Sequence, residues 1–354
     1  MQNPFKPKHR SILGIDISSG SIKVIELSGG NGTHCVEGYG CTSLPPNAVE
    51  GHEIKDVDAV ANCIKQLLST ERMSSKYASI ALPDSAVISK VLQVSDGLDE
   101  QEIEEFILME ADKYIPYPID EINMDFELVG RSVKNASMND VLLVASRSEN
   151  VNSRVEAATK AGLTVKAVDV ESFAIERTMS LLTKELPVDK KDTVVAVIDI
   201  TEEYANLFVL SDMKLVYTRE DEFGTKQMVN DIINQYGVGM DEALQIKSGK
   251  TRPEDYDEKI VIPFVDTFVV YVRRSLQFFF STSHHAEIDH IFLAGGVASI
   301  SNLAMRVQEE TEIPTTIANP IRDMIISNNV SSTSLADDAP SLLIACGLAL
   351  RKIR

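Results

Sequence analysis

Two apolar segments of the sequence each end in an aspartate and a short polar turn. The first is Asp16 with the turn 18–21, and the second is Asp199 with the turn 201–203. A turn between two strands gathers main-chain N–H groups and hydroxyls at one place, which suits a phosphate. Lys23 lies on the same strand face as Ser21, because side chains alternate along a strand. The first turn therefore predicts a phosphate site, the alternative being a solvated hairpin with a surface lysine; its residues would be Ser18, Ser19, Gly20, Ser21 and Lys23.

Two further features would complete a nucleotide site. Asp16, with Asp199 as its counterpart, could hold Mg²⁺ through water, because magnesium keeps much of its hydration in proteins. Late in the chain, Ala294-Gly295-Gly296 follows an apolar strand and would let a flat ligand approach the backbone closely. The alternative for the glycine pair is an ordinary turn between a strand and a helix.

The segments around the two aspartates resemble each other, which predicts two related domains. Residues 12–27 read ILGIDISSGSIKVIEL, and residues 195–210 read VAVIDITEEYANLFVL. Each reads as a β-hairpin, and a third strand and an amphipathic helix follow it in both halves. These helices are expected at 57–68 and 225–236. The pattern predicts an α/β protein that contains two copies of one unit.

Residues 84–165 follow a different pattern, which predicts a small α+β subdomain inserted into the first half. After a strand at 87–94, Asp99 and Glu102 have the spacing of a capping box and mark the start of a helix. Two prolines, Pro116 and Pro118, must end this helix. The remaining elements expected in the block are strands at 122–129 and 141–146, a helix at 150–161 and a strand at 163–170.

The composition fits a soluble globular protein and disfavours several classes. The chain has 354 residues, enough for two domains, with 34 basic and 53 acidic residues and a formal net charge of −19. This balance disfavours nucleic acid and direct adsorption to an anionic membrane, because both require a basic surface. The four cysteines form no CxxC pair, so a reduced cytosol is expected. Adjacent His284 and His285 cannot share one helix face, so no metal site is expected there.

The sequence predicts neither a membrane-spanning helix nor a secretory signal. No stretch is apolar over the roughly 20 residues that a spanning helix needs. The N-terminus is basic but lacks the apolar core of a signal peptide, so residues 1–10 are expected to form a flexible arm. We therefore expect a cytoplasmic protein.

Several segments together resemble the PilM family of type IV pilus assembly proteins. The phosphate hairpin, the second hairpin with its own aspartate and the late glycine pair are typical of the superfamily of actin, sugar kinases and heat-shock chaperones. The block 110–127, where a helix breaks into Tyr-Ile-Pro-Tyr-Pro, narrows the resemblance to PilM. The other segments that carry it are LGIDISSGSIKVIEL (13–27), LPPNAV (44–49), VKAVDVESFAIER (165–177), RSLQFFF (274–280), LAGGVASI (293–300) and ACGLALR (345–351).

The resemblance implies an actin-like (ribonuclease H-like) fold with subdomains similar to 1A, 1C, 2A and 2B around a nucleotide cleft. On this basis the first, 1A-like domain should comprise residues 11–83, about 166–190 and 336–354. Residues 84–165 should form the inserted 1C-like subdomain, and residues 191–335 the second domain, similar to 2A and 2B.

The resemblance also implies ligands and partners. ATP and Mg²⁺ should bind in the cleft, and a groove between 1A and 1C should hold the N-terminal cytoplasmic tail of a PilN-like inner-membrane protein. Tyr114, Ile115 and Tyr117 are candidate groove residues, the alternative being that they pack the subdomain core. The pilus motor ATPases and the platform protein are further implied partners. The protein would then lie peripherally at the inner membrane, attached only through partners.

The second phosphate turn departs from the superfamily pattern. That turn is usually Asp-x-Gly followed by small residues, but here Thr201 replaces the glycine, and Glu202 and Glu203 follow it. Acidic groups near a triphosphate are repulsive unless a cation or an outward rotamer intervenes. The sequence therefore does not decide whether the protein hydrolyses ATP and is an enzyme. It also allows the alternative of a scaffold that no longer binds nucleotide.

A second departure lies in the helix at 240–249. Lys247 matches a lysine that meets the nucleoside in related proteins, whereas Leu244 stands where an acidic partner is usual. Just before this helix, Gly224, Thr225 and Gln227 open another helix and could approach the nucleotide through its N-terminus.

Two other functions are alternatives to that of a PilM-like adaptor. An FtsA-like division protein needs an amphipathic C-terminal helix after a linker, whereas the last residues of this sequence are the segment ACGLALRKIR, with Arg354 as its final residue. A sugar-kinase-like phosphotransferase needs a catalytic base facing a substrate hydroxyl, and no isolated Asp or Glu marks one. The sequence therefore favours a PilM-like adaptor.

Overall fold

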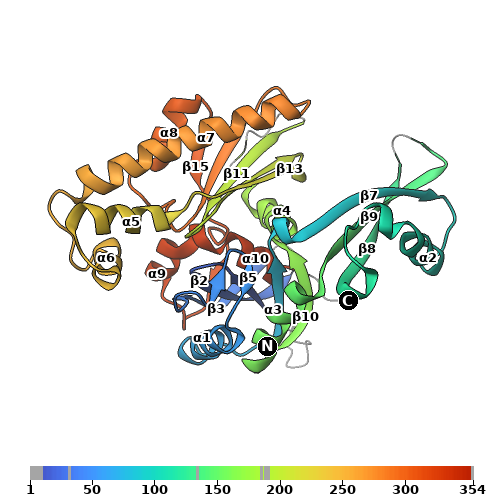
Figure 1. The fold of residues 1–354 in the computed structure, drawn as a ribbon, viewed down its shortest axis with the longest axis horizontal. Coiled ribbons are helices and arrows are strands. Elements are labelled where there is room, and N and C mark those ends of the chain that lie inside the picture. Colours follow the sequence, from blue (N-terminus) through green and yellow to red (C-terminus); the bar gives the residue numbers. More distant parts are fainter. Residues whose placement is uncertain (1–10, 31–32, 133–134, 184–185, 187–191, 352–354) are drawn as a thin grey trace, which may run out of the picture.

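Two large sheets with helices between and around them form the body of the protein (Figure 1). The computed structural model describes residues 11–30, 33–132, 135–183, 186 and 192–351. The arm expected at residues 1–10 lies outside these described residues.

The first sheet has six strands in the order β10-β6-β1-β2-β3-β16. β1 pairs antiparallel with β2 and parallel with β6, and the register places Asp16 opposite Lys23. Residues directly opposite each other project from the same face of a sheet, so these two side chains meet. The strands are β1 (Ile12–Ile17), β2 (Ser21–Gly30), β3 (Thr33–Ser43), β6 (Tyr77–Leu82), β10 (Thr164–Val170) and β16 (Ile325–Ile326).

The second sheet has five strands in the order β13-β12-β11-β14-β15. β11 pairs antiparallel with β12 and parallel with β14, the same arrangement that β1 has with β2 and β6. The expected duplication is therefore confirmed. The strands are β11 (Val194–Ile200), β12 (Ala205–Ser211), β13 (Lys214–Asp221), β14 (His290–Gly295) and β15 (Thr315–Ile317).

The helices form three layers around the two sheets. α1 (Val57–Thr70) and α3 (Ser148–Lys160) share one core with the first sheet. α4 (Glu171–Leu182) and α10 (Leu343–Ala349) contact each other, and both share a core with β11, β12 and β14 of the second sheet. The outer core of the second sheet includes α5 (Thr225–Tyr236), α6 (Met240–Lys247), α7 (Ile262–Thr282) and α8 (Leu303–Thr311). A short helix, α9 (Ser332–Asp338), precedes α10.

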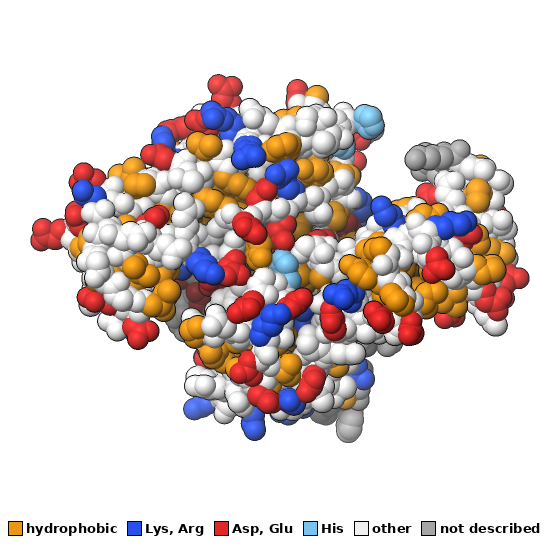
Figure 2. All heavy atoms as spheres, in the orientation of Figure 1, with side chains coloured by type: hydrophobic (Ala, Val, Ile, Leu, Met, Phe, Trp, Pro, Cys, Tyr) orange, Lys and Arg blue, Asp and Glu red, His pale blue; other side chains and the backbone are white. Residues whose placement is uncertain are grey.

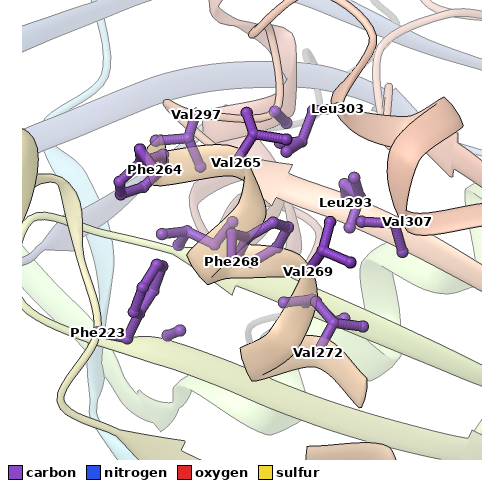
Figure 3. Packing of buried hydrophobic residues seen from close by; sticks show 14 of the residues in the cluster. Phe223, Phe264, Val265, Phe268, Val269, Val272, Leu293, Val297, Leu303 and Val307 are labelled. Carbon is purple, nitrogen blue, oxygen red and sulfur yellow. The ribbon is translucent and has the colours of Figure 1, made fainter. Parts of the chain in front are cut away.

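α7 supplies most of the aromatic core of the second half. Phe264 and Phe268 flank Phe223, with ring centroids 5.4 and 5.9 Å apart, and Figure 3 shows this cluster beside Leu293 of β14. Pro263 lies in the first turn of α7, which continues directly from a π-helical turn (Asp257–Val261).

A small subdomain projects from one side of the first half (Figure 1). Its sheet has the strand order β7-β9-β8 and packs on α2 (Glu100–Glu110). The capping box predicted at the start of this helix is confirmed. Glu102 N donates to Asp99 Oδ1, and Asp99 N donates to Glu102 Oε2, both at 2.9 Å. Figure 2 shows hydrophobic side chains on this lobe and acidic ones over much of the visible face. Its strands are β7 (Val87–Ser95), β8 (Ile122–Arg131) and β9 (Met138–Arg147).

Two elements pack with the first sheet although the expected domain boundaries assigned them to other parts of the protein. α3, expected within the inserted block, packs on α1 and belongs to the core of the first sheet. β16, expected in the second domain, pairs with β3 in the first sheet. A small hairpin of β4 (Val49–Glu50) and β5 (Glu53–Ile54) was not expected, because two-residue strands are too short to show alternation. Among the described residues, no helix has both the length and the apolar character needed to cross a membrane.

Gly14→Ala should destabilise the fold, because α10 lies directly on β1. A Cβ at Gly14 would lie 1.9 Å from the carbonyl oxygen of Ala345 and 2.7 Å from the amide nitrogen of Ala349. Backbone atoms cannot rotate away, so overpacking should lower the free energy of unfolding by about 1–3 kcal/mol in urea denaturation.

Gly296→Ala is the matched control, because a Cβ there meets no atom within 4 Å. Its unfolding midpoint should stay close to that of the wild type. Equal midpoints for Gly14→Ala and the wild type would show that α10 does not pack on β1 this closely.

Candidate functional site

The turn between β1 and β2 is closed by its own serines. Ser18 N donates to Ser21 O at 3.0 Å, Ser18 Oγ donates to the same oxygen at 3.1 Å, and the two hydroxyl oxygens lie 3.1 Å apart. Ser19 Oγ, in contrast, is buried without a hydrogen-bond partner. Because buried polar groups are nearly always hydrogen-bonded, this hydroxyl indicates a place where water or a ligand oxygen would fit.

Asp16 and Lys23 form a buried ion pair at the base of this turn. Lys23 Nζ lies 3.1 Å from Asp16 Oδ2, and both side chains are almost fully covered. Burial by itself would lower the pKa of Lys23, but the charges of Asp16, Asp199 and Glu202 outweigh it, so the pKa lies above its ordinary value. Lys23 is therefore a permanent cation between the two halves.

Asp199 of β11 faces the same space from the second half. Burial raises the pKa of Asp199 to about 6; Lys23 opposes this rise, while Asp16 and Glu202 add to it. Desolvation disfavours the ionised form of a carboxyl group, and neighbouring negative charges do the same. A cation brought into this space would relieve that cost.

Two further charged residues at this place were missed by the sequence analysis. Glu171 begins α4, and burial, followed by the charges of Asp16, Asp84 and Asp199, raises its pKa well above the ordinary value, while Arg154 opposes the rise. A signal for Glu171 existed, because it directly follows a strand end, as the turns after Asp16 and Asp199 do.

Arg154 gave no such signal, because a charged residue on a helix such as α3 ordinarily faces solvent. Its side chain is nevertheless buried, with 2% of the residue exposed. Nη2 donates to His52 O at 2.9 Å, and Nε has no hydrogen-bond partner. Burial lowers the pKa of Arg154, and the charges of Glu171 and Asp16 oppose that effect.

Most of these residues line a cavity of about 20 Å³ between the two halves, whereas Gly20, Ser21 and Lys23 do not line it. Such a volume has room for about one water molecule and not for a triphosphate. The cavity brings together Asp16, Ser18, Ser19, Asp199 and Thr201 of the predicted site, and adds Arg154 and Glu171.

The second turn is held by its main chain. Thr201 N donates to Tyr204 O at 2.9 Å, and Tyr204 N donates to Thr201 Oγ1 at 3.2 Å. Thr225 N and Lys226 N, at the start of α5, donate to the carbonyl oxygens of Thr201 and Glu202 at 3.1 and 2.8 Å. The first amides of α5 are therefore hydrogen-bonded to this turn.

This arrangement changes the expectation for the residues that open α5. Thr225 N, expected to reach the nucleotide, is hydrogen-bonded to the turn, and Gly224 is buried, since a Cβ there would lie 2.2 Å from Glu202 O. Gln227 N donates to Gly224 O at 3.1 Å, and its side chain is exposed. Lys247 does face this region, because its Nζ donates to Thr225 Oγ1 at 2.6 Å. Burial lowers the pKa of Lys247.

The late glycine pair lies at the end of β14 and does not line the small cavity. Gly295 is buried against β11, with φ of 85° and a hypothetical Cβ 2.1 Å from Ile200 O, so only glycine fits there. Gly296 is exposed with open space around its Cα. A flat ligand could approach Gly296, whereas Gly295 serves the packing of the strands.

A metal held by protein ligands alone finds no site in the part of the chain that the structure describes. No group of three or more His, Cys, Asp or Glu side chains is arranged to hold a metal ion there. The oxygen donors of Asp16 and Asp199 do fit a hydrated Mg²⁺, and a cation would offset the burial and the neighbouring negative charges that raise the pKa of Asp199. Magnesium through water at these two residues stays a prediction.

A larger cavity of about 420 Å³ lies where the β4–β5 hairpin meets the three-stranded sheet. Ile115 and Tyr117 line it, Ile115 as a buried residue and Tyr117 with 38% of its surface exposed. The guanidinium of Arg147 lies 5.1 Å from the centre of the Tyr117 ring. Tyr114, also 38% exposed, is not among the residues that line the cavity.

The two cavities share a wall. Gly51, His52 and Tyr204 line both of them. The rings of His52 and Tyr204 stack with centroids 4.6 Å apart, and His52 Nε2 lies 2.8 Å from Glu220 Oε1. His52 belongs to the first half, whereas Tyr204 and Glu220 belong to the second. The two contacts of His52 therefore join the halves beside both cavities.

Comparison with known proteins identifies the fold and the family. A family model described as "Type IV pilus assembly protein PilM" matches residues 14–353. A solved chain of the "PilM-PilN type IV pilus biogenesis complex" is 27% identical, with a TM-score of 0.79, and the match covers 98% of this chain and 100% of that one. Ethanolamine utilization protein EutJ from Carboxydothermus hydrogenoformans is 14% identical, with a TM-score of 0.57 and 98% and 91% coverage, which shows the fold alone. The expected actin-like α/β fold is confirmed.

Asp199→Asn should stabilise the protein at neutral pH. The pKa of Asp199 is about 6 in the folded protein and 3.8 ordinarily. Between these two pH values, the folded protein keeps a proton on Asp199 that the unfolded chain has lost. Stability is therefore lost as the pH rises through roughly 4 to 6, and the ionised form costs about 3 kcal/mol above that window. At pH 7.5 the variant should gain about 1–3 kcal/mol in urea denaturation, and at pH 4 it should match the wild type.

Asp16→Asn is the contrasting control, because it leaves the buried Lys23 without its hydrogen-bonded carboxylate. This variant should be less stable than the wild type at pH 7.5. A loss of stability in Asp199→Asn at pH 7.5 would mean that the charge of Asp199 is compensated in the folded protein.

Proposed function

The chain belongs to the PilM family of type IV pilus assembly proteins, and we propose that it is an adaptor with two ligands, ATP in the interdomain cleft and a PilN-like peptide in the adjoining cavity. The peptide would be the N-terminal cytoplasmic tail of an inner-membrane protein, and through it the adaptor would join an inner-membrane complex. Contacts with the pilus motor ATPases and the platform protein belong to the same proposal. With the family established, neither the division protein nor the sugar kinase is favoured.

The observation that carries the peptide site is the cavity of about 420 Å³. It lies between the β4–β5 hairpin of the first half and the projecting subdomain, where a groove between 1A and 1C was expected. Tyr117 and Arg147 offer an aromatic face and a cation at its edge, and Ile115 offers an apolar floor. The lining also includes charged side chains such as Glu50 and Glu53, so the cavity offers both apolar and polar contacts to a peptide.

ATP binding is supported by the first turn and its surroundings. Lys23 provides a permanent positive charge, Ser19 an unpaired hydroxyl, and Asp16 and Asp199 the oxygen donors for a hydrated Mg²⁺. We propose weak or absent hydrolysis, because Thr201 carries a side chain where related turns have glycine. The small volume of the present cavity favours a second candidate, a scaffold that binds no nucleotide.

The shared wall offers a physical reason for one ligand to affect the other. His52 and Tyr204 contact each other and line both cavities. A ligand in the cleft that shifts the Tyr204 side chain would therefore also change the peptide cavity. Such coupling would let the nucleotide state affect which partner the adaptor holds.

Lys23→Ala should weaken the binding of Mg-ATP by at least about tenfold, because a charge-assisted contact to a phosphate contributes roughly 1.5–3 kcal/mol. Isothermal titration calorimetry measures the affinity, and phosphate release is followed in the same sample. Lys226→Ala is the control lysine, since Lys226 pairs with Glu203 on the surface. Binding without turnover supports the adaptor; absence of binding to the wild type supports the scaffold.

Tyr117→Ala should weaken binding of the PilN-like tail peptide by about tenfold, because truncated aromatic anchors commonly cost 1–2 kcal/mol or more. Fluorescence anisotropy of the labelled peptide measures this. Tyr114→Ala is the control, because Tyr114 is equally exposed but does not line the cavity. Equal losses in both variants would contradict the site.

Cell fractionation tests the attachment to the membrane. Removal of the tail from the membrane partner should release the adaptor into the soluble fraction. Unchanged membrane association after this removal would exclude the tail as the anchor.

A further inference from the structure

Glu202 and Glu203 occupy adjacent positions of the second turn but have different surroundings. Glu203 pairs with Lys226 on the surface, with Oε1 and Nζ 2.7 Å apart. Glu202 instead crosses from the second half to the first turn. A Cβ placed on Gly20 would lie 2.4 Å from Cγ, 2.5 Å from Cδ and 2.9 Å from Oε1 of Glu202. Real Cβ atoms do not come so close, so the Glu202 side chain lies directly over the Cα of Gly20.

This position lies against the turn that is predicted to bind a phosphate. Gly20 is the glycine of the predicted phosphate turn, and its lack of a side chain provides the space that Glu202 fills. The charge of Glu202 acts on Lys23 in the first half and on Lys247 in the second. A carboxylate in this field interacts with the same cations as a phosphate oxygen would.

We propose that the carboxylate of Glu202 occupies the phosphate subsite of the ligand-free protein as an internal competitor, which a nucleotide must displace. The proposal rests on the proposed nucleotide site. A phosphate that approached the Cα of Gly20 would meet the Glu202 side chain first. Under this proposal, the acidic turn 201–203 lowers the affinity for nucleotide but does not abolish the nucleotide site.

Displacement requires only the side chain to move. The main chain of the turn is fixed by Thr201 N to Tyr204 O and by Lys226 N to Glu202 O, at 2.9 and 2.8 Å. The Glu202 side chain is itself half-buried and can rotate toward solvent. The turn can therefore stay in place while its carboxylate leaves the subsite.

Glu202→Ala should bind Mg-ATP and metal-free ADP about tenfold more tightly than the wild type, because the competing charge is gone. Glu202→Gln should show a smaller gain, since it removes the charge but keeps the bulk. Glu203→Ala is the matched control and should bind as the wild type does, because Glu203 points to Lys226. Isothermal titration calorimetry measures all four proteins after circular dichroism has shown that they are folded.

The outcomes separate this proposal from the proposed function. Equal affinities of wild type and Glu202→Ala would overturn the competitor and leave nucleotide binding intact. Weaker binding of Mg-ATP, but not of metal-free ADP, by Glu202→Ala would overturn it in favour of a metal ligand. Absence of binding in the wild type and in both Glu202 variants would overturn the competitor together with the nucleotide site.

Discussion

Burial of charge between the two halves is the constraint on which the rest of the structure depends. Asp16 and Asp199 end the central strands of the two sheets, and 4% and 7% of their surfaces are exposed. Charges in such a place are costly unless they are paired. Lys23 supplies the pair for Asp16 because the register of β1 and β2 sets the two residues opposite each other. The hairpin is therefore fixed in register both by its apolar face and by this ion pair.

Two kinds of contact join the halves, and they differ in chemical character. At the base, α4 and α10 carry apolar side chains that share a core with β11, β12 and β14. Beside the two cavities, the described contacts between the halves include the stacked rings of His52 and Tyr204, the contact of His52 with Glu220, and the side chain of Glu202 over Gly20. The halves are therefore joined both by apolar packing and by polar contacts next to the proposed sites.

The sequence predicts local features of this architecture well and contacts between distant segments poorly. The two hairpins, the capping box at Asp99 and Glu102 and the helix at 225–236 follow from patterns within a few residues. Arg154 could not be predicted, because a single charged residue on an amphipathic helix looks like a surface residue until tertiary packing buries it. The turn 201–203 shows an intermediate case. Its acidity was evident as a source of repulsion, but only the fold shows that one carboxylate points outward and the other across the cleft.

Stability and ligand binding make opposite demands on such a cleft. A phosphate site needs cations, and buried cations without a counter-ion would destabilise the protein whenever the ligand is absent. Lys23 already has Asp16 as its direct partner, and Asp199 and Glu202 add negative charge around it. Asp199 belongs to a central strand, β11, whereas Glu202 belongs to a turn. The side chain of Glu202 is half-exposed. Of these neighbours, Glu202 is thus the one that can leave when a stronger anion arrives, so the same side chain can stabilise the empty protein and yield to a ligand.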